Sequence, residues 1–330
     1  MSRLAEIEPV AEATSGLGLI GDIGATNARF ALVQPQSGTS TPRLYALNDF
    51  PSLEEAIRAY LAEALPGGRP EQAVLAVASP ITGDTVALTN HAWTFSIEGL
   101  RQRIGLKRLR VINDFAATAL AVPHLTDADR LQIGSGASVA AAPAALIGPG
   151  TGLGVSALIA TPSGMVPLAG EGGHVTMAAA TARESAVLDL MRERYDHVSA
   201  ERVLSGPGLV NLYAALCELA NVPAAPFRPA QITSPRVWEE DARAREATEM
   251  FCAMLGTVAG NLALTFAARG GVFVAGGIVP RLGVFFAQSE FRARFEAKGR
   301  FRSYLAAIPT YVITRPLPAL VGAAALLQQA

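Results

Sequence analysis

The chain has 330 residues, which is more than one hydrophobic core usually organises, so we expect two lobes. Half of its residues are hydrophobic and 17% are charged, and this composition excludes a disordered or fibrous chain. The formal net charge is -1, from 27 basic and 28 acidic residues, and no basic run is interleaved with aromatic side chains. Nucleic acid and a membrane surface are therefore not expected as partners.

The cysteines and the N-terminus favour a cytoplasmic protein. Cys217 and Cys252 lie far apart within apolar helical patterns, with neither metal-ligand spacing nor the pattern of a disulfide framework. The N-terminus lacks the basic start and apolar core of a signal peptide, and no stretch is expected to reach the length of a membrane span. Residues 1–15 are predicted to be a flexible tail, to which we assign no function.

The first elements in chain order are two strands and a helix. Residues 17–24 and 28–33 are apolar and partly alternating, and residues 25–27 form a polar junction, which predicts an antiparallel pair with an exposed turn. Helical periodicity follows over residues 52–65, with Ser52 in the position of an N-cap. Strands and helices then begin to alternate.

Polar residues stand at the end of a later strand. Strands are expected at 73–78 and 109–112, and a helix at 116–122. Asn113 and Asp114 therefore lie at a strand's carboxyl end, where open α/β sheets bind their ligands. Asp114 suits the task of accepting a hydroxyl proton in phosphoryl transfer, and it equally suits that of capping the helix. The two interpretations are compatible.

The second half of the chain repeats the hairpin pattern and then becomes mainly helical. Strands at 144–147 and 153–159 flank a glycine-rich turn, as at the start of the chain, which hints at a duplicated design of two lobes. The other expected elements are helices at 183–195, 207–219 and 241–268, a strand at 272–275, and a final strand and helix.

The sequence contains the residues of a dinucleotide-binding fingerprint, but not in the structural context that this motif needs. Residues 16–21 match G-x-G-x-x-G, but that motif needs a preceding strand and a helix that opens on its last glycine, whereas here a second strand follows. A nicotinamide enzyme is therefore not expected. The chain also lacks a G-x-x-x-x-G-K-[ST] loop, which excludes a Walker-type site.

Three glycine-rich segments suit the binding of a nucleotide. In the first hairpin turn, small residues would let backbone N–H groups approach phosphate oxygens, and the Thr26 hydroxyl would be a further donor. Asp22 would then lie near a magnesium ion. The alternative interpretation is an ordinary Asx-type turn. The turn at 148–154 has four glycines in seven residues, which packing does not readily explain. Gly276 and Gly277 follow a buried strand and would receive adenine and ribose.

Polar residues suited to sugar recognition follow the second hairpin. Glu171 and His174 stand three residues apart across a glycine pair, and Glu201 begins another polar cluster. A sugar requires several donors and acceptors that converge on neighbouring hydroxyl groups. A lone histidine is more often structural, and zinc is not expected because no second His or Cys stands at ligand spacing.

The motifs resemble the bacterial glucokinase family in order and spacing. They are Gly21-Asp-Ile-Gly-Ala-Thr-Asn27, Thr89-Asn-His91, Ile112-Asn-Asp-Phe115, Gly150-Thr-Gly-Leu-Gly154, Gly170-Glu-Gly-Gly-His174, Glu201-Arg-Val-Leu-Ser-Gly-Pro-Gly208 and the block from Gly271 to Arg281. The resemblance runs from about residue 18 to the C-terminus. It implies the two-lobed α/β fold of actin-like ATPases (ribonuclease H-like), with a substrate cleft between a small lobe (16–124, with 316–330 returning) and a large lobe (125–315).

The resemblance also implies ATP-dependent phosphorylation of D-glucose at its 6-hydroxyl, with Mg²⁺, Asp114 as the general base and a homodimeric assembly. The positions that match glucose-binding residues are Asn113, Asp114, Glu171, His174 and Glu201. The positions that match the two ATP phosphate loops are Gly21, Asp22, Ile23, Gly24, Ala25 and Thr26, and then Gly150, Thr151 and Gly152.

Two departures from related sequences bear on these expectations. Ala25 replaces the glycine that is usual in the first loop, and it would cost about 1 kcal/mol if the turn needs a positive φ there. The related sugar kinases and repressors carry a zinc-binding cysteine cluster that this chain lacks, which favours the glucokinase branch. A kinase for another hexose and a non-catalytic sugar-sensing regulator remain as alternatives.

Overall fold

The computed structural model describes residues 16–34 and 38–329. They form two compact units: one runs up to Asp114 and resumes at Ala323, and the other is Phe115–Gly322. The lobe boundaries expected from the sequence remain predictions. The predicted tail, residues 1–15, lies outside the described residues.

The sheet of the first unit brings the ends of three parallel strands to one edge. Its strands are β1 (Gly18–Ile23), β2 (Asn27–Gln34), β3 (Gly38–Thr39), β4 (Arg43–Ala46), β5 (Gln72–Val77) and β8 (Arg108–Asn113). Their order is β3-β2-β1-β5-β8, with β4 also paired to β2. The hairpin β1–β2 is antiparallel as expected, whereas β1, β5 and β8 are parallel. Ile23 lies opposite Val77, and Val77 lies opposite Asn113.

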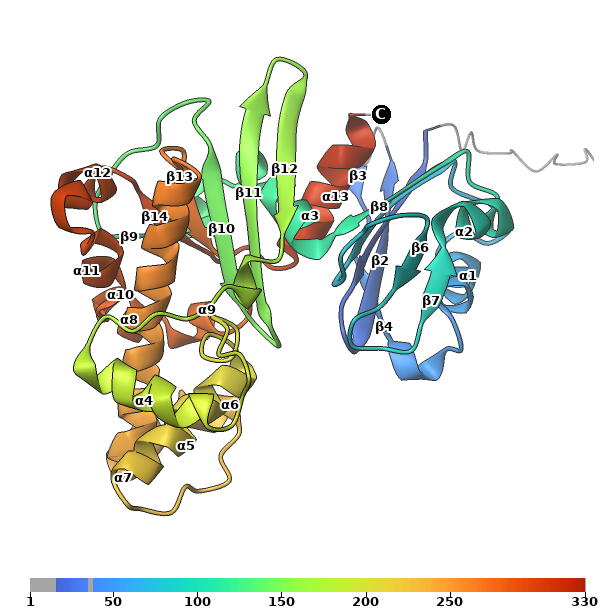
Figure 1. Ribbon diagram of the computed structural model, residues 1–330. Coiled ribbons are helices and arrows are strands. Elements are labelled where there is room, and N and C mark those ends of the chain that lie inside the picture. The colour runs from blue at the N-terminus through green and yellow to red at the C-terminus, as the bar shows by residue number, and fades with distance from the viewer. Residues whose placement is uncertain (1–15, 35–37, 330) are drawn as a thin grey trace, which may run out of the picture. The chain divides into compact units, whose positions relative to one another are not determined.

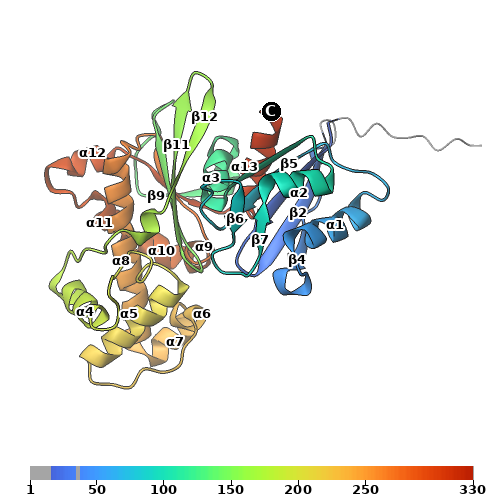
Figure 2. The same ribbon diagram turned by 45° about the vertical axis from the view of Figure 1, so that its right-hand side comes forward.

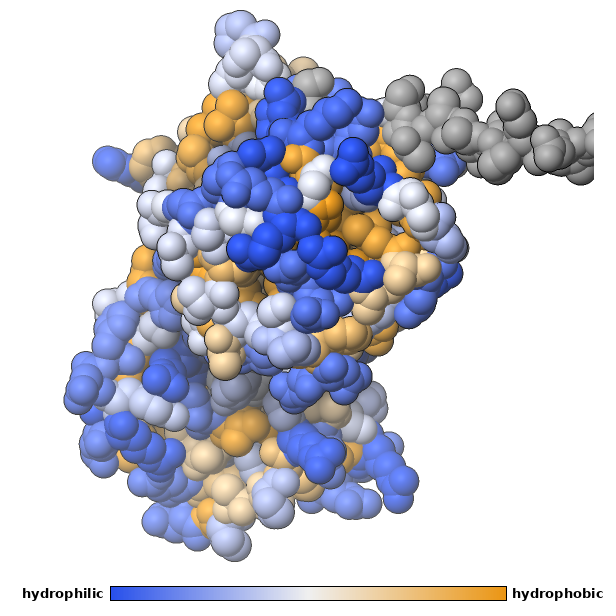
Figure 3. Space-filling model, turned by 90° about the vertical axis from the view of Figure 1, so that its right-hand side faces the viewer, coloured by the Kyte–Doolittle hydropathy of each residue, from blue (hydrophilic) through white to orange (hydrophobic). Residues whose placement is uncertain are grey.

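Helices α1 (Leu53–Ala64) and α2 (Ile97–Ile104) cover one face of this sheet (Figure 2). The expected N-cap is confirmed, because the Ser52 hydroxyl accepts a hydrogen bond from the backbone N–H of Glu55 at 3.2 Å. Tyr60 and Leu100 bury one side of each helix in the core. The outer surface of these helices carries ion pairs such as that of Arg103 with Glu54, and Figure 3 shows hydrophilic residues over much of that side of the unit. A short hairpin, β6 (Thr85–Ala87) with β7 (Thr94–Ser96), leads into α2.

The sheet of the second unit has the same strand arrangement as the first. Its strands are β9 (Arg130–Ile133), β10 (Ala144–Pro149), β11 (Leu153–Thr161), β12 (Gly164–Gly170), β13 (Gly271–Val274) and β14 (Thr310–Ile313). Their order is β12-β11-β10-β13-β14-β9. In both sheets an antiparallel hairpin contributes its first strand to a parallel trio, here β10, β13 and β14. The duplication that the sequence hints at is thus visible in the pairing of the strands.

Helices make up much of the rest of the second unit. They are α3 (Asp114–Ala121), α4 (Ala182–Arg192), α5 (Gly206–Leu219), α6 (Pro229–Ile232), α7 (Pro235–Glu240), α8 (Ala242–Thr265), α9 (Val279–Leu282), α10 (Val284–Gln288), α11 (Phe291–Glu296), α12 (Arg302–Ala306) and α13 (Pro318–Gln328), of which α3 and α13 each cross a boundary between the units. Figure 1 shows α4, α5, α6 and α7 gathered around the first half of α8. The long helices expected from the sequence are confirmed.

From the sequence, no stretch is expected to reach the length of a membrane span. Helix α8 corrects this expectation, because by length and composition it could cross a membrane. However, 72% of its most apolar window is buried inside the structure, as in the core helix of a globular protein. Cys252 on α8 and Cys217 on α5 are both buried free thiols. Burial raises the pKa of Cys252 to about 12, so this thiol stays protonated and is a poor nucleophile.

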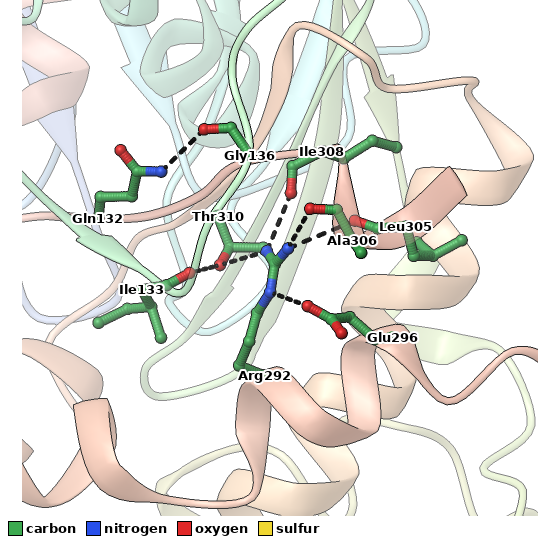
Figure 4. Close-up of polar contacts among 9 residues, drawn as sticks. All are labelled: Gln132, Ile133, Gly136, Arg292, Glu296, Leu305, Ala306, Ile308 and Thr310. Carbon is green, nitrogen blue, oxygen red and sulfur yellow. Dashed lines mark hydrogen bonds and ion pairs between the residues drawn. The ribbon is translucent and has the colours of Figure 1, made fainter. Parts of the chain in front are cut away.

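Arg292 holds together four segments of the second unit (Figure 4). Its guanidinium donates to the backbone carbonyls of Ala306 and Ile308, each at 2.9 Å, and to the Thr310 hydroxyl at 3.2 Å. Its Nε donates to Glu296 at 2.6 Å. The Thr310 hydroxyl in turn donates to the carbonyl of Ile133. One side chain on α11 thereby connects the end of α12, the start of β14 and the end of β9.

Candidate active site

Asn113 and Asp114 lie at the carboxyl edge of the first sheet, as expected. Asn113 is the last residue of β8, and Asp114 is the first residue of α3. Helix α3 therefore begins one residue earlier than a capping role for Asp114 requires, and the carboxylate lies in its first turn. The positive end of a helix dipole favours a carboxylate at that position.

Ser79 is a residue of this edge that the sequence analysis missed. Its backbone carbonyl accepts a hydrogen bond from the Asn113 side-chain amide at 3.5 Å, and its buried hydroxyl lies 3.1 Å from the hydroxyl of Thr89. The backbone N–H of Thr89 also donates to the Ser79 hydroxyl at 2.8 Å. Ser79 follows β5, the neighbour of β8, so its position after a predicted strand was the available signal.

The first hairpin turn carries two backbone N–H groups that are not used within the turn. The N–H of Gly24 donates to the carbonyl of Asn27 at 2.9 Å and closes the turn. The N–H groups of Ala25 and Thr26 find no acceptor among the residues that the structure describes. Two adjacent backbone donors of this kind suit a phosphate oxygen. Ala25 is not among the residues with positive φ, so the cost considered for an alanine there does not arise.

Gly21 has a packing reason to be a glycine. It lies in the middle of β1, paired with β2 on one side and β5 on the other. A Cβ atom there would come within 2.7 Å of Leu75 and 3.0 Å of Phe30. Ile23 is fully buried in the same core. The nucleotide-binding roles of these two residues remain predictions.

Asp22 is a partly buried carboxylate next to the first turn. Burial raises its pKa, and the positive charge of Arg29, 3.6 Å away, acts in the opposite direction. Among the described residues no three His, Cys, Asp or Glu side chains form a metal-binding group. Mg²⁺ commonly binds proteins through one or two carboxylates together with substrate phosphates, so a single carboxylate beside a loop predicted to bind phosphate fits this ion.

The second loop, residues 150–152, is a tight turn between β10 and β11. The N–H of Gly150 donates to the carbonyl of Gly152, and its carbonyl accepts from the N–H of Gly206 at the start of α5, both at 2.8 Å. Thr151 is exposed. The N–H groups of Thr151 and Gly152 find no acceptor in the described part of the chain, as in the first loop.

Packing against the Phe115 ring explains two of the four glycines in this turn, which corrects the expectation drawn from the sequence. Gly148 and Gly154 pair directly across the hairpin. A Cβ at either position would meet the ring of Phe115, at 2.3 Å from Gly148 and 2.0 Å from Gly154. The glycine pair is therefore a slot for that aromatic ring. A Cβ on Gly152 would come within 2.4 Å of the Glu201 carboxylate, so only Gly150, where a Cβ would meet nothing within 4 Å, is not explained by packing.

Glu171 precedes a 3-10 turn, Gly172–His174, of which His174 is the last residue, and both side chains are exposed. The His174 Nε2 atom lies 4.0 Å from the Glu171 carboxylate. The glycines between them pack closely on β11: a Cβ on Gly173 would come within 2.1 Å of the Leu153 carbonyl oxygen. The glycine pair therefore permits a close approach that larger residues would block.

Glu201 connects this turn to the second loop. Its backbone N–H donates to the Gly173 carbonyl, and its Oε2 accepts from the N–H of Leu153, both at 2.8 Å. The Ser205 hydroxyl, which caps α5, donates to the Glu201 carbonyl at 2.7 Å. The structure thus brings together Glu201, the turn at 171–174 and the loop at 150–152, which the sequence treated as separate motifs.

The third glycine-rich segment lies against the second loop. Gly276 has a φ of +83°, and a Cβ there would come within 2.3 Å of the Pro149 carbonyl oxygen. Gly277 is exposed, and a Cβ there would meet nothing within 4 Å. Gly276 is thus required by the backbone, whereas Gly277 leaves open surface beside it. A role for either residue in binding adenine and ribose remains a prediction.

Comparisons with known proteins agree with this arrangement. A family model described as Glucokinase matches residues 19–330. The chain is 54% identical to a glucokinase of Paramagnetospirillum magneticum over 313 residues, covering 94% of this chain and 98% of that protein. It is 51% identical to a glucokinase of Aromatoleum aromaticum over 313 residues, covering 94% and 95% of the two chains.

A solved structure shows the same fold. The crystal structure of a glucokinase from an Antarctic psychrotroph superposes with a TM-score of 0.86 at 37% identity, covering 96% of this chain and 99% of that one. The expected α/β fold of the actin-like type is confirmed. The family match over nearly the whole sequence and the identities above 50% lead to one conclusion: the chain belongs to the glucokinase family.

Proposed function

We propose that this chain transfers the γ-phosphoryl group of ATP to the 6-hydroxyl of D-glucose, with Asp114 as the general base. The observation that carries the assignment of the base is the position of Asp114 at the carboxyl edge of the first sheet, immediately after Asn113. Phosphoryl transfer needs the acceptor oxygen in line with the phosphorus and a carboxylate that orients the hydroxyl and takes its proton. Asp114 performs that task in this proposal.

The sugar-binding residues supply hydrogen-bond partners for the other hydroxyl groups. The Asn113 amide can donate and accept, and the carboxylates of Glu171 and Glu201 accept from sugar hydroxyls. His174 donates or accepts according to its tautomer. Together these groups hold one hydroxyl near Asp114. They lower the free-energy barrier of phosphoryl transfer mainly by orienting the sugar, without taking part in bond making or breaking.

The nucleotide is held by backbone donors and by a metal ion in this proposal. The N–H groups of Ala25, Thr26, Thr151 and Gly152 bind phosphate oxygens, and Asp22 holds Mg²⁺. When bound, Mg²⁺ neutralises charge on the phosphate groups and on the transferring phosphoryl group. Ser79 keeps the Asn113 side chain oriented at the sheet edge.

The test is a coupled assay of glucose-dependent ADP release. Asp114→Asn keeps the size of the side chain but removes the base, so we expect its kcat to fall by about 10² to 10⁴-fold. Asp189→Asn makes the same change at an exposed position on α4 and should retain the wild-type rate. Equal rates for wild type and Asp114→Asn would remove Asp114 from this role. A panel of hexoses checks the substrate, and a higher kcat/KM for another hexose would overturn the assignment of glucose.

We also propose that the protein acts in the cytoplasm as a homodimer. An apolar depression in the second unit supports self-association, since exposed Leu168 and Val175 line it together with Leu262 of α8 and with Phe266, which follows α8. Exposed apolar patches often mark interaction surfaces. Sedimentation of wild type and of Val175→Lys tests this: a dimer that the substitution dissociates supports the proposal, and a monomeric wild type contradicts it.

A further inference from the structure

The carboxylate of Glu201 lies directly against the second loop. Its Oε2 atom accepts the backbone N–H of Leu153 at 2.8 Å, immediately after the loop. A Cβ atom on Gly152 would come within 2.4 Å of the same oxygen. Gly152 is therefore small because Glu201 occupies the space beside it.

Glu201 also lies at the centre of a connected set of hydrogen bonds. Its N–H donates to the carbonyl of Gly173, within the turn proposed to bind the sugar. Gly150 in the loop is held from its other side by the N–H of Gly206, and α5 is capped by Ser205, which itself donates to Glu201. The loop and the sugar turn are thus joined through one residue.

The two carboxylate oxygens of Glu201 are in different situations. Oε2 is engaged by the Leu153 N–H, whereas Oε1 accepts no hydrogen bond from the residues that the structure describes. A carboxylate can accept at both oxygens. One oxygen can therefore hold the loop while the other remains for a sugar hydroxyl.

We propose that Glu201 is a positioning residue for the second nucleotide loop, so that one carboxylate couples the binding of nucleotide and sugar. The identity of the two ligands rests on the function proposed above. The coupling is reciprocal, because any factor by which sugar binding changes the nucleotide affinity must equal the factor by which nucleotide binding changes the sugar affinity.

The acceptor oxygen of Glu201, and not its negative charge, is the feature that serves the nucleotide. A negative charge near a phosphate is unfavourable, whereas a hydrogen bond to the Leu153 N–H stabilises the loop at any charge. Glu201→Gln retains an acceptor oxygen at the same position, and Glu201→Ala removes it and leaves the Leu153 N–H without this partner. The two substitutions therefore separate the contribution of the acceptor oxygen from that of the negative charge.

The experiment measures the binding of ADP to the protein by isothermal titration calorimetry, in the presence of Mg²⁺ and in the absence of sugar. Loss of the hydrogen bond that holds the loop predicts that Glu201→Ala weakens ADP binding about tenfold. Glu201→Gln should bind ADP as well as the wild type does. Glu171→Ala is the matched control, since it removes another carboxylate proposed to bind sugar and should leave ADP binding unchanged.

A second variant tests the contact itself. Gly152→Ala should weaken ADP binding in the wild-type background, because its Cβ would meet the Glu201 carboxylate. In the Glu201→Ala background that clash is absent, so adding Gly152→Ala should cause a smaller further loss. This non-additivity is the expected sign of two residues in direct contact.

The outcomes separate this proposal from the proposed function. Circular dichroism and urea unfolding check that the Glu201→Ala variant is folded. If the folded variant binds ADP with wild-type affinity, the positioning role is overturned. Equal weakening in Glu201→Ala and Glu201→Gln would overturn it as well, because the acceptor oxygen would then not be the cause. Unchanged glucose affinity in both variants would instead contradict the sugar-binding role of Glu201, and with it the coupling, while the positioning of the loop by Glu201 would stand.

Discussion

A glycine in this chain can be required by close packing or by the approach of a ligand. The atoms that an added Cβ would meet distinguish the two cases. At Gly154 the Cβ would fall 2.0 Å from the Phe115 ring, whereas at Gly150 it would meet nothing within 4 Å. The sequence shows only that both are glycines in one motif. Their different reasons depend on Phe115, which is more than 30 residues away in the chain.

Gly154→Ala should therefore destabilise the protein more than Gly150→Ala does. The added methyl group overlaps the Phe115 ring, and overpacking of this kind typically costs about 1–3 kcal/mol in the free energy of unfolding. Gly150 is the control, since it has open space and no positive φ. Urea unfolding of both variants measures the difference. If both lose the same stability, Phe115 is not the cause, and Phe115→Leu should then fail to rescue Gly154→Ala.

Strands and helices were predictable where local periodicity defines them. The capped helix α1 and the two hairpins follow from patterns of a few residues, because hydrophobic spacing and turn chemistry are local properties. The role of Arg292 was not predictable in this way. Its partners, from Leu305 to Thr310, lie on segments without a distinctive pattern, and only folding brings their carbonyl groups to the guanidinium.

Arg292→Lys should lower the free energy of unfolding by about 2–4 kcal/mol, because an ammonium group cannot reproduce the planar set of donors and leaves buried carbonyl groups unpaired. Arg245→Lys is the matched control. Its exposed pair with Glu249 on α8 should contribute about 0.5 kcal/mol or less. Thermal and urea unfolding compare the two variants. Similar losses in both would show that the contacts in Figure 4 contribute little to stability.

The described residues form two cores, and the two sheets share one strand arrangement. The order β3-β2-β1-β5-β8 in the first unit corresponds to β12-β11-β10-β13-β14 in the second. Each hairpin carries a loop with two adjacent backbone donors, at 25–26 and at 151–152. The repeated topology explains why the two loops that we propose to bind phosphate occur at equivalent places in a chain whose halves share little sequence.

Glucose should stabilise the folded protein as a whole, because a ligand that binds only the native state shifts the unfolding equilibrium. At a concentration one hundred times its Kd it contributes about 2.7 kcal/mol, which for a chain of this size raises Tm by about 2–4 °C. Differential scanning fluorimetry with D-glucose measures the shift. L-glucose, which has the same composition and opposite chirality, is the control, and an equal shift with both sugars would exclude specific binding.

The sequence by itself determined the types and order of the main elements, the strand-end position of Asp114 and the family resemblance, because each of these is written in local spacing or in contiguous motifs. Tertiary structure decided which glycines serve packing, that Ser79 contacts Asn113, and that Glu201 contacts the loop before Leu153. These contacts join residues 34 to 48 positions apart. No local pattern encodes such pairs, since they form only when the sheet and its helices have packed.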